Sequence, residues 1–426
     1  MPKHPGVVNL SKFQGINNTE LPENTDPSYL KEAINIDISK KGDVTKRLGF
    51  QKVKSGTRVH SIWGNELDCY YVNDGELRYL YKGYDVKALD TGIGNNRVDY
   101  LYLNGSVYYT SRGNNGTLTG DERKPFGIET PNLSPTLIEG AGSLYEGQYQ
   151  VSLSYVDVNG LESGSRLATA ITVGDGASIH ISNIPVSSDP LVAYVRLYMS
   201  TTNGEVLYIA KDVSNGATTA IIHNDRNLIT PNETISIDTP PLGDLISYFE
   251  GSVLIADGRT LWFSEPYTPT WFKTSKNFYQ FDSEITMLMP LESGVYVGLG
   301  NRVVWLSGNS VEDLSAKEKE ICKPVKYSNV KIPSGYIVID NTPLGPKWLF
   351  TSDEGMYVCM ENGVMFNVTA KNVSFPSADE GVGMFMQNDG INKYISLLKD
   401  QNSDGQNMAV GDLVTAEVIR NGIVIP

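Results

Sequence analysis

Cysteine and long apolar runs are scarce in this sequence. Its 426 residues include only Cys69, Cys322 and Cys359, an odd number without clustered spacing. That count excludes a disulfide framework and a cysteine-based metal site, so we expect three buried thiols. The N-terminal stretch MPKHPGVVNLSKFQG lacks an apolar core of signal-peptide length, and no later window approaches the roughly 20 apolar residues of a membrane helix. We therefore expect a soluble chain that is not exported by a signal peptide.

Positive charge is also scarce. The chain carries 35 lysines and arginines against 49 aspartates and glutamates, a formal net charge of −14. Tight, sequence-independent binding of a phosphate backbone is built from clustered cations, so this balance argues against a DNA-binding protein. An acidic surface would instead suit a wall along which DNA slides without sticking.

Residues typical of short strands and turns are abundant. There are 24 tyrosines and 41 glycines, and aromatic and β-branched runs alternate with Gly, Asn and Asp turns, as in an all-β chain. One phrase of turn, strand, turn and strand occurs five times. Its copies are WGNELDCYYVNDGELRYLYKG from Trp63, LNGSVYYTSRGNNGTL from Leu103, FEGSVLIADGRTLWFSE from Phe249, LESGVYVGLGNRVVWLSG from Leu291 and SDEGMYVCMENGVMFNV from Ser352. Each copy predicts a β-hairpin, and the series predicts a β-propeller-like domain.

The spacing of the copies indicates the domain organisation. Leu67 and Val107 are 40 residues apart, and Val253 and Val295 are 42 apart, which is the length of a four-stranded propeller blade. Val107 and Val253 are 146 residues apart, which indicates an inserted domain. The predicted parts are an N-terminal arm with the first strands at 1–50, a first propeller part at 51–130, the insert at 131–241, a second propeller part at 242–400, and C-terminal strands closing the propeller at 401–426.

The predicted insert has longer alternating strands than its surroundings. Between TPNLSPT and DTPPLG lie GQYQVSLSYVDVNGLESGSR, SIHISNI, AYVRLYMSTTNGEVLYIAKDV and TTAIIHND. This pattern is typical of an immunoglobulin-like β-sandwich, although the Cys and Trp hallmarks of antibody domains are missing. We predict a module resembling fibronectin type III, with Tyr149, Val151, Leu153 and Tyr155 on one face.

Helical signals are few. DPSYLKEAINID, from Asp26, begins with a capping residue and predicts one or two helical turns. SVEDLSAKEKEI, from Ser310, is highly charged and predicts a solvated loop or a short helix at a blade edge.

Catalytic signatures are missing from the sequence. The four histidines are far apart and without metal-ligand spacing, and no G-x-S-x-G elbow occurs. Sialidase propellers carry repeated S-x-D-x-G-x-x-W boxes, whereas TSDEGMYV offers Ser352, Asp353 and Gly355 once and at the wrong spacing. The paired carboxylates of a glycosidase cannot be assigned either. We predict no catalytic residues, no bound organic cofactor and no enzymatic activity.

One acidic loop has the first half of a calcium-binding pattern. DQNSDGQN places Asp400, Asn402 and Asp404 at alternate positions, followed by Gly405. The bidentate acid expected at the twelfth position is replaced by Gly411. The loop thus predicts a calcium site, with an Asx-rich surface turn as the simpler alternative.

Aromatic residues are dense in LWFSEPYTPTWFKTSKNFYQFDS. They could form a ligand-stacking platform, but this density favours filling between blades. The residues concerned are Trp262, Phe263, Trp271, Phe272, Phe278, Tyr279 and Phe281. An exposed subset would mark an interface.

Three passages resemble a known class of proteins. FQGINN and AINIDISKKGDVTKRLGFQKV precede the hairpins, and LWFSEPYTPTWFKTSKNFYQFDSEITMLMPLESGVYVGLGNRVVWLSG ends in an apolar strand with Trp-Leu-x-Gly. Together they resemble bacteriophage tail proteins, in particular the nozzle or hub proteins that end the tail of short-tailed phages.

The resemblance implies a structural virion protein in the tail, assembled in the cytoplasm of a bacterial host. It implies a homo-oligomeric ring of about six copies, closed by head-to-tail contacts, that continues the DNA channel for ejection. Its implied partners are the tail adaptor, tail fibre proteins, genomic DNA passing without specific binding, and the host envelope. Two alternatives stay open: a carbohydrate-binding or glycan-hydrolysing propeller, and a soluble protein-interaction scaffold.

Overall fold

A computed structural model gives the fold in atomic detail. It describes residues 12–33, 36–38, 42–46, 52, 54–320, 322–336, 338–339, 342–343, 345–369, 372–373, 378–388, 391–400, 413–414, 419–420 and 423–424. Over these ranges the regular structure is β-strand apart from one 3-10 turn, η1 (Glu361–Gly363), so the all-β prediction is confirmed. None of the described segments forms a helix long and apolar enough to cross a membrane.

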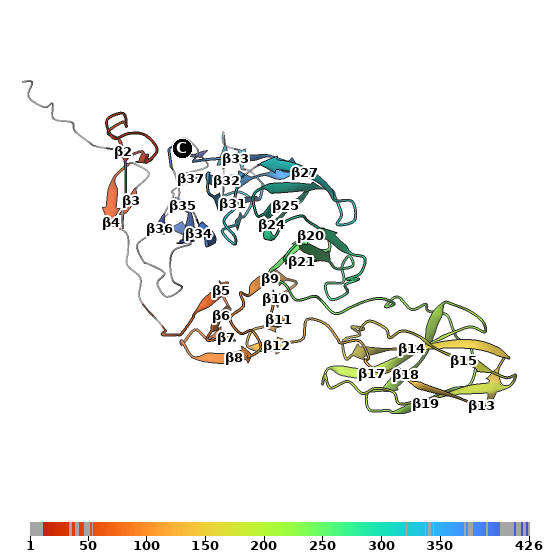
Figure 1. Ribbon diagram of the computed structural model, residues 1–426. Helices are drawn as coiled ribbons and strands as arrows, with labels where there is room; N and C mark the ends of the chain where they lie inside the picture. Colours follow the sequence, from red (N-terminus) through yellow and green to blue (C-terminus); the bar gives the residue numbers. More distant parts are fainter. Residues whose placement is uncertain are drawn as a thin grey trace, which may run out of the picture. The chain divides into compact units, whose positions relative to one another are not determined.

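The chain divides into two compact units. The first comprises Met1–Gly56, Ser247–Glu250 and Phe281–Pro426, and the second comprises Thr57–Ile246 and Gly251–Gln280. Figure 1 gives the strand labels for both units.

The second unit begins with two antiparallel four-stranded sheets of the kind that forms propeller blades. The strands of the first are β5 (His60–Gly64), β6 (Cys69–Asn73), β7 (Glu76–Leu80) and β8 (Val86–Asp90); those of the second are β9 (Asp99–Leu103), β10 (Ser106–Thr110), β11 (Asn115–Thr119) and β12 (Glu122–Lys124). The two sheets share one apolar core that includes Tyr70, Leu77, Val107, Tyr109 and Leu118. Burial of this common face, which neither sheet could cover alone, holds the two blades together.

A third sheet of the same kind follows the insert. It consists of β20 (Leu245–Phe249), which spans the boundary between the units, and of β21 (Ser252–Asp257), β22 (Thr260–Phe263) and β23 (Phe278–Gln280). The β22–β23 connection, residues 264–277, is long for a hairpin loop.

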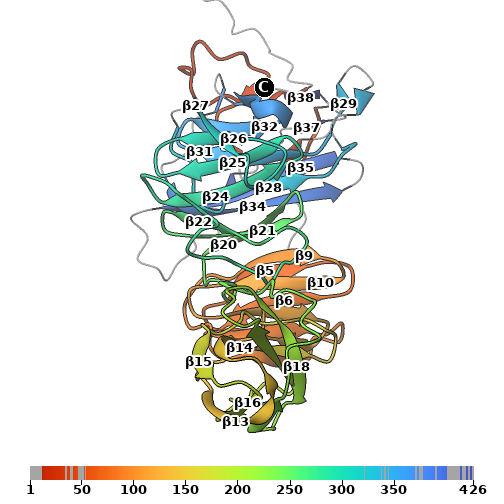
Figure 2. The ribbon, with the colours of Figure 1, turned by 90° about the vertical axis from the view of Figure 1, so that its right-hand side faces the viewer.

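The insert is a two-sheet sandwich. One sheet has the order β13-β16-β19 and the other the order β15-β14-β17-β18. The bounds are β13 (Thr136–Leu144), β14 (Gly147–Asp157), β15 (Thr169–Val173), β16 (Ala177–Ser182), β17 (Val192–Ser200), β18 (Leu207–Ser214) and β19 (Thr219–Ile222). Both sheets contribute to one core, and the four residues predicted to share a face on β14 are all buried in it. The alternation of apolar residues along β14 is therefore explained by this core. Figure 2 views these strands end-on.

The strand order of the insert differs from that of an immunoglobulin constant domain. In that fold the first two strands belong to the same sheet, whereas β13 and β14 belong to different sheets. The sandwich is present, and its membership of the fibronectin type III class stays a prediction.

The first unit holds two further blade-type sheets, ordered β24-β25-β26-β27 and β28-β31-β32-β33. Their bounds are β24 (Ile285–Leu291), β25 (Gly294–Leu299), β26 (Val303–Ser307), β27 (Ser315–Glu320), β28 (Val330–Ile332), β31 (Lys347–Ser352), β32 (Gly355–Cys359) and β33 (Met365–Asn367). They share a core around Trp305, Tyr296, Phe350 and Tyr357. Cys322 and Cys359 are buried in the same core, while Cys69 is partly buried, and all three are free thiols.

The other strands of the first unit form the last sheet and three two-stranded pairs. The last sheet contains β34 (Ala378–Asn388), β35 (Ile391–Asp400), β36 (Leu413–Val414), β37 (Ile419–Arg420) and β38 (Ile423–Val424). Three two-stranded pairs complete the unit: β1 (Gly15–Ile16) with β2 (Tyr29–Leu30), β3 (Ile36–Ile38) with β4 (Val44–Lys46), and β29 (Val338–Ile339) with β30 (Thr342–Pro343). Lys393 Nζ of β35 lies 2.8 Å from Asp37 Oδ1 of β3. This ion pair ties the N-terminal arm to the last sheet.

The five predicted hairpins are all present. Each copy of the phrase supplies two adjacent strands of one blade-type sheet. β6–β7, β10–β11, β21–β22 and β25–β26 are the central pairs of their sheets, and β32–β33 includes the edge strand β33. In the Asp74-Gly75 and Asn104-Gly105 turns both residues have positive φ. That geometry matches the right-handed twist of the flanking strands and is the reason for Asx-Gly at these points. The propeller-like prediction is thereby confirmed.

The helical turns predicted from Asp26 are not formed in the described residues, and of the two alternatives for the stretch from Ser310, loop or short helix, the helix is not formed. Residues from Asp26 form a turn that leads into β2, which pairs with β1. The charged stretch from Ser310 forms a turn and then β27, whose Ala316 and Lys317 pair with Leu306 and Trp305 of β26. A charged strand is stable here because β27 is at the sheet edge, where Lys317 is exposed to water and charge discourages edge-to-edge association.

Candidate functional site

The most distinctive local structure of the second unit lies where the insert meets the 264–277 loop. Two segments of the insert contribute to it: residues 162–166 lie between β14 and β15, and residues 231–238 lead out of the sandwich. Asp238 and Phe272 form an antiparallel bridge with N–H···O distances of 2.6 and 3.4 Å, and Phe272 is fully buried. We call this region, residues 162–166, 231–238 and 264–277, the junction.

Trp271 joins the two sides of the junction. Its indole Nε1 donates a hydrogen bond of 2.8 Å to the backbone carbonyl of Glu162. The indole is partly buried, so this bond satisfies a donor that would otherwise be shielded from water.

The Glu162 side chain points back into the insert. Its carboxylate accepts hydrogen bonds from Ser154 Oγ at 2.5 Å and from the Tyr198 hydroxyl, and Arg196 lies 3.0 Å away. Burial, followed by the hydrogen bond to Glu162, raises the pKa of Tyr198, so this phenol stays protonated and remains a donor. Glu162 is thus held by its side chain in the sandwich and by its backbone to the 264–277 loop.

In the other part of the junction, the backbone of residues 162–166 lies directly against the backbone of residues 231–238. Ser165 N donates to Thr234 O at 3.0 Å, and a Cβ built on Gly164 would lie only 1.9 Å from Ile237 O. Only glycine fits at this position, because any side chain would push apart the backbone segments that contain Gly164 and Ile237.

The 264–277 loop is braced by Glu265. The Glu265 carboxylate pairs with Lys273 Nζ at 3.1 Å and accepts from Asn277 Nδ2 at 2.7 Å, while its backbone N–H donates to Trp271 O at 2.8 Å. These contacts hold the loop in one shape and present Trp271 to the insert.

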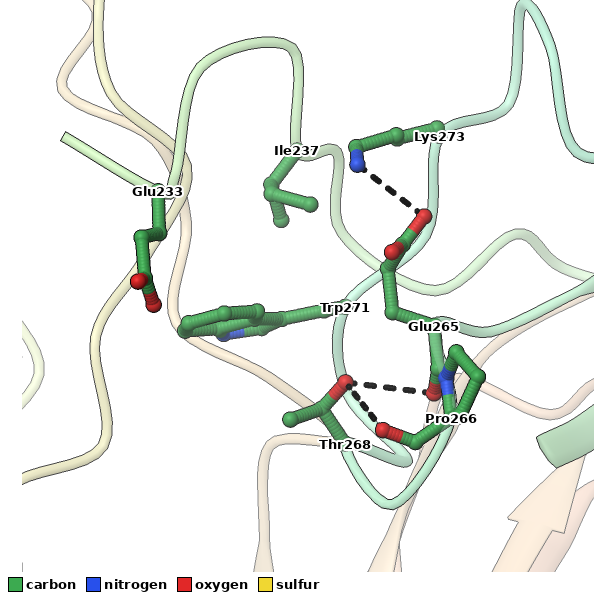
Figure 3. A pocket seen from close by; sticks show the side chains of 7 residues that line it. All are labelled: Glu233, Ile237, Glu265, Pro266, Thr268, Trp271 and Lys273. Carbon is green, nitrogen blue, oxygen red and sulfur yellow. Dashed lines mark hydrogen bonds and ion pairs between the residues drawn. The ribbon is translucent and has the colours of Figure 1, made fainter. Parts of the chain in front are cut away.

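A cavity of about 420 Å³ opens at the junction. Its walls combine an indole, two carboxylates, one ammonium and small apolar groups, as Figure 3 shows. The lining residues are Glu233, Ile237, Glu265, Pro266, Thr268, Trp271 and Lys273. In Figure 3 the Glu233 carboxylate lies beside the outer edge of the Trp271 indole, and the Lys273–Glu265 pair lies toward the opposite end.

The aromatic residues predicted to fill the space between blades have mixed environments. Phe263 and Phe272 are buried, whereas Phe278 is 41% exposed. Trp262, Trp271, Tyr279 and Phe281 are partly buried. The structure thus brings Trp271 alone of this set into the cavity wall.

The predicted calcium ligands lie at and beyond the edge of the described residues. Asp400 ends β35, and Asn402 and Asp404 lie outside the described residues. Elsewhere, no group of three or more His, Cys, Asp or Glu side chains in the described ranges is arranged to hold a metal ion. The calcium site stays a prediction.

The sialidase-like residues form a turn. Ser352 and Gly355 are the ends of the β31–β32 hairpin, where Ser352 Oγ donates to Gly355 O at 3.2 Å, and Asp353 Oδ1 accepts from Lys323 N at 2.9 Å. Their spacing is thus explained by a hairpin turn.

Sequence reasoning missed Glu162, Glu233 and Lys273. Each is a charged residue in a loop without a motif, so the sequence carries no signal for them. The PTWFK run that holds Trp271 and Lys273 stands out in the sequence only by its aromatic density.

Comparisons with known proteins give no family. No protein-family model matches the chain, and no curated protein matches it. Solved structures with some likeness include a streptogramin B lyase (12% identity, 82% of this chain and 93% of that chain, TM-score 0.34). Others are a virginiamycin B lyase from Staphylococcus aureus (10%, 79% and 90%, TM-score 0.31) and the N-terminal domain of Nup159 (10%, 83% and 77%, TM-score 0.30). Similarity at this level supports no conclusion about activity.

Proposed function

We propose that this chain is a structural protein of a bacteriophage tail, a nozzle or hub that forms a ring at the tail end and continues the DNA channel. In this role it contacts copies of itself, the tail adaptor and tail fibres, and meets the host envelope at infection. The proposal assigns it no catalytic step.

The observation that carries the proposal is that the 264–277 loop holds the insert in place. This loop lies in the passage that resembles phage tail proteins, and its residues serve to fasten the insert through Trp271 and Glu162. A loop with that task is expected in a scaffold that must hold a projecting domain in a fixed direction for a neighbouring subunit or fibre.

Net charge supports the same role. The formal charge of −14 disfavours binding to a nucleic-acid backbone. Weak binding is required of a channel wall, because a genome must pass through the channel quickly. A carbohydrate-processing propeller or a soluble scaffold has no comparable need.

Stoichiometry in purified, DNA-filled particles tests the proposal. Quantitative mass spectrometry against a capsid protein of known copy number should find this chain at a fixed count of about six per particle, as a closed ring requires. Its complete absence from particles, with abundant chain in the lysate, would contradict the proposal.

A further inference from the structure

We infer that the junction cavity binds a neutral saccharide unit. Its volume of about 420 Å³ falls within the roughly 300–1,000 Å³ of small-molecule sites. The cavity is formed by residues of one unit of a single chain, so the inference stands independently of a role in a phage tail.

The indole of Trp271 supplies the stacking surface. Its Nε1 already donates a hydrogen bond to the Glu162 carbonyl, and this bond fixes the plane of the ring. The ring can therefore contact a ligand only through its apolar surface. The face of an aromatic ring carries negative charge density, and the C–H groups on one side of a pyranose are weakly positive. A fixed ring at the cavity wall therefore suits the apolar face of a sugar.

The polar groups of the wall select a neutral ligand. Glu233 is exposed and Glu265 is paired with Lys273, so acceptors and a donor are both present. Two carboxylates against one ammonium disfavour an anion, and because Glu265 is already neutralised by Lys273, Glu233 is the one carboxylate of the wall left to attract a cation. Hydroxyl groups donate to carboxylates and accept from ammonium, so a polyhydroxylated neutral molecule can use all three side chains.

Backbone strain marks the same loop. Tyr267 lies between Pro266 and Thr268 of the cavity wall, has φ of 60° and is 84% exposed. A tyrosine in the left-handed region costs free energy, and such strain concentrates in ligand-binding loops. An exposed aromatic side chain held in this way is consistent with a loop shaped for a ligand.

Saturation-transfer NMR with the full-length chain tests the inference. The probes are glucose, galactose, mannose, N-acetylglucosamine and lactose, with tetramethylammonium as a cationic probe and sulfate as a competitor. We expect at least one sugar to receive saturation on its ring C–H protons. Sulfate in excess should leave that signal unchanged.

Two variants locate the signal. Glu233→Ala removes an exposed carboxylate and should raise the Kd of the sugar by about tenfold, the loss expected for one hydrogen bond to a charged group. Glu205→Ala, also at an exposed loop position, is the matched control and should leave the Kd unchanged. Circular dichroism of both variants should match that of the parent chain.

Three outcomes would overturn the inference. One is the absence of saturation transfer to all five sugars. Another is binding of tetramethylammonium with no sugar bound, which would make the cavity a cation site. The third is a sugar Kd that Glu233→Ala leaves unchanged, which would place binding elsewhere on the chain.

Discussion

The indole nitrogen of Trp271 and the backbone carbonyl of Glu162 lie 2.8 Å apart and are joined by a hydrogen bond. The two residues are separated by 109 positions, one in a loop of a blade-type sheet and the other in the β14–β15 connection of the insert. The bond thereby couples the orientation of the sandwich to the shape of the 264–277 loop.

Replacing the indole should weaken this coupling. Trp271→Phe keeps an aromatic ring but removes the donor, and we expect the free energy of unfolding to fall by about 1–2 kcal/mol because a shielded carbonyl loses its partner. Urea unfolding followed by far-UV circular dichroism measures this. Trp262→Phe is the matched control, since the Trp262 indole makes no hydrogen bond within the described residues, and an equal loss in both variants would argue against the coupling.

A side chain at position 164 should destabilise the chain, because the structure leaves no room for it. Gly164→Ala places a Cβ 1.9 Å from Ile237 O, so the backbone must move, and we expect a loss of about 2–3 kcal/mol together with faster proteolysis of the 231–238 segment. Gly83→Ala, where a Cβ would meet no atom within 4 Å, is the control and should change stability little. Similar protease resistance in the two variants would contradict the close approach.

Relief of strain at Tyr267 should stabilise the chain. Asparagine tolerates the left-handed region better than tyrosine, and the ring is largely exposed, so Tyr267→Asn should raise the free energy of unfolding by about 0.5–1 kcal/mol. Tyr145→Asn, at another exposed tyrosine, should bring no gain. A destabilised Tyr267→Asn variant would show that the ring contributes packing that outweighs its strain.

A buried lysine gives the first unit a pH-dependent stability. Burial lowers the pKa of Lys347 below its usual 10.5, so between its folded and unfolded pKa values the unfolded chain binds more protons and stability rises with pH. Below the folded pKa the ammonium is charged and its burial penalty is fully present. Lys347→Met should therefore raise the Tm at pH 7, and the gain should shrink as the pH approaches 10.5.

Lys276 is the control for this effect. It is exposed, so Lys276→Met should change the Tm at pH 7 little. A gain for Lys347→Met that stays constant from neutral pH to pH 10.5 would show that added apolar contact, rather than titration, is its cause.

The sequence predicted the hairpins because their signals are local. Asp74-Gly75 and Asn104-Gly105 specify turns by backbone conformation, and alternating apolar residues specify which face is buried, as along β14. The charged strand β27 escaped prediction because its structure comes from pairing with β26, and pairing overrides local propensity.

The junction could not be predicted for a related reason. Trp271 and Glu162 are brought together by the fold across a long sequence separation, and no motif links them. Glu233 and Lys273 reach the same cavity from different loops. Single-sequence patterns describe faces and turns, whereas a cavity between loops depends on how separate elements pack.

The central claim, that this chain ends a phage tail, is tested most directly by immunogold electron microscopy of purified virus particles. An antibody raised against the inserted sandwich should place gold at the distal end of the tail in intact particles. Unlabelled tails, in particles from a lysate in which the antibody detects abundant chain, would contradict the claim.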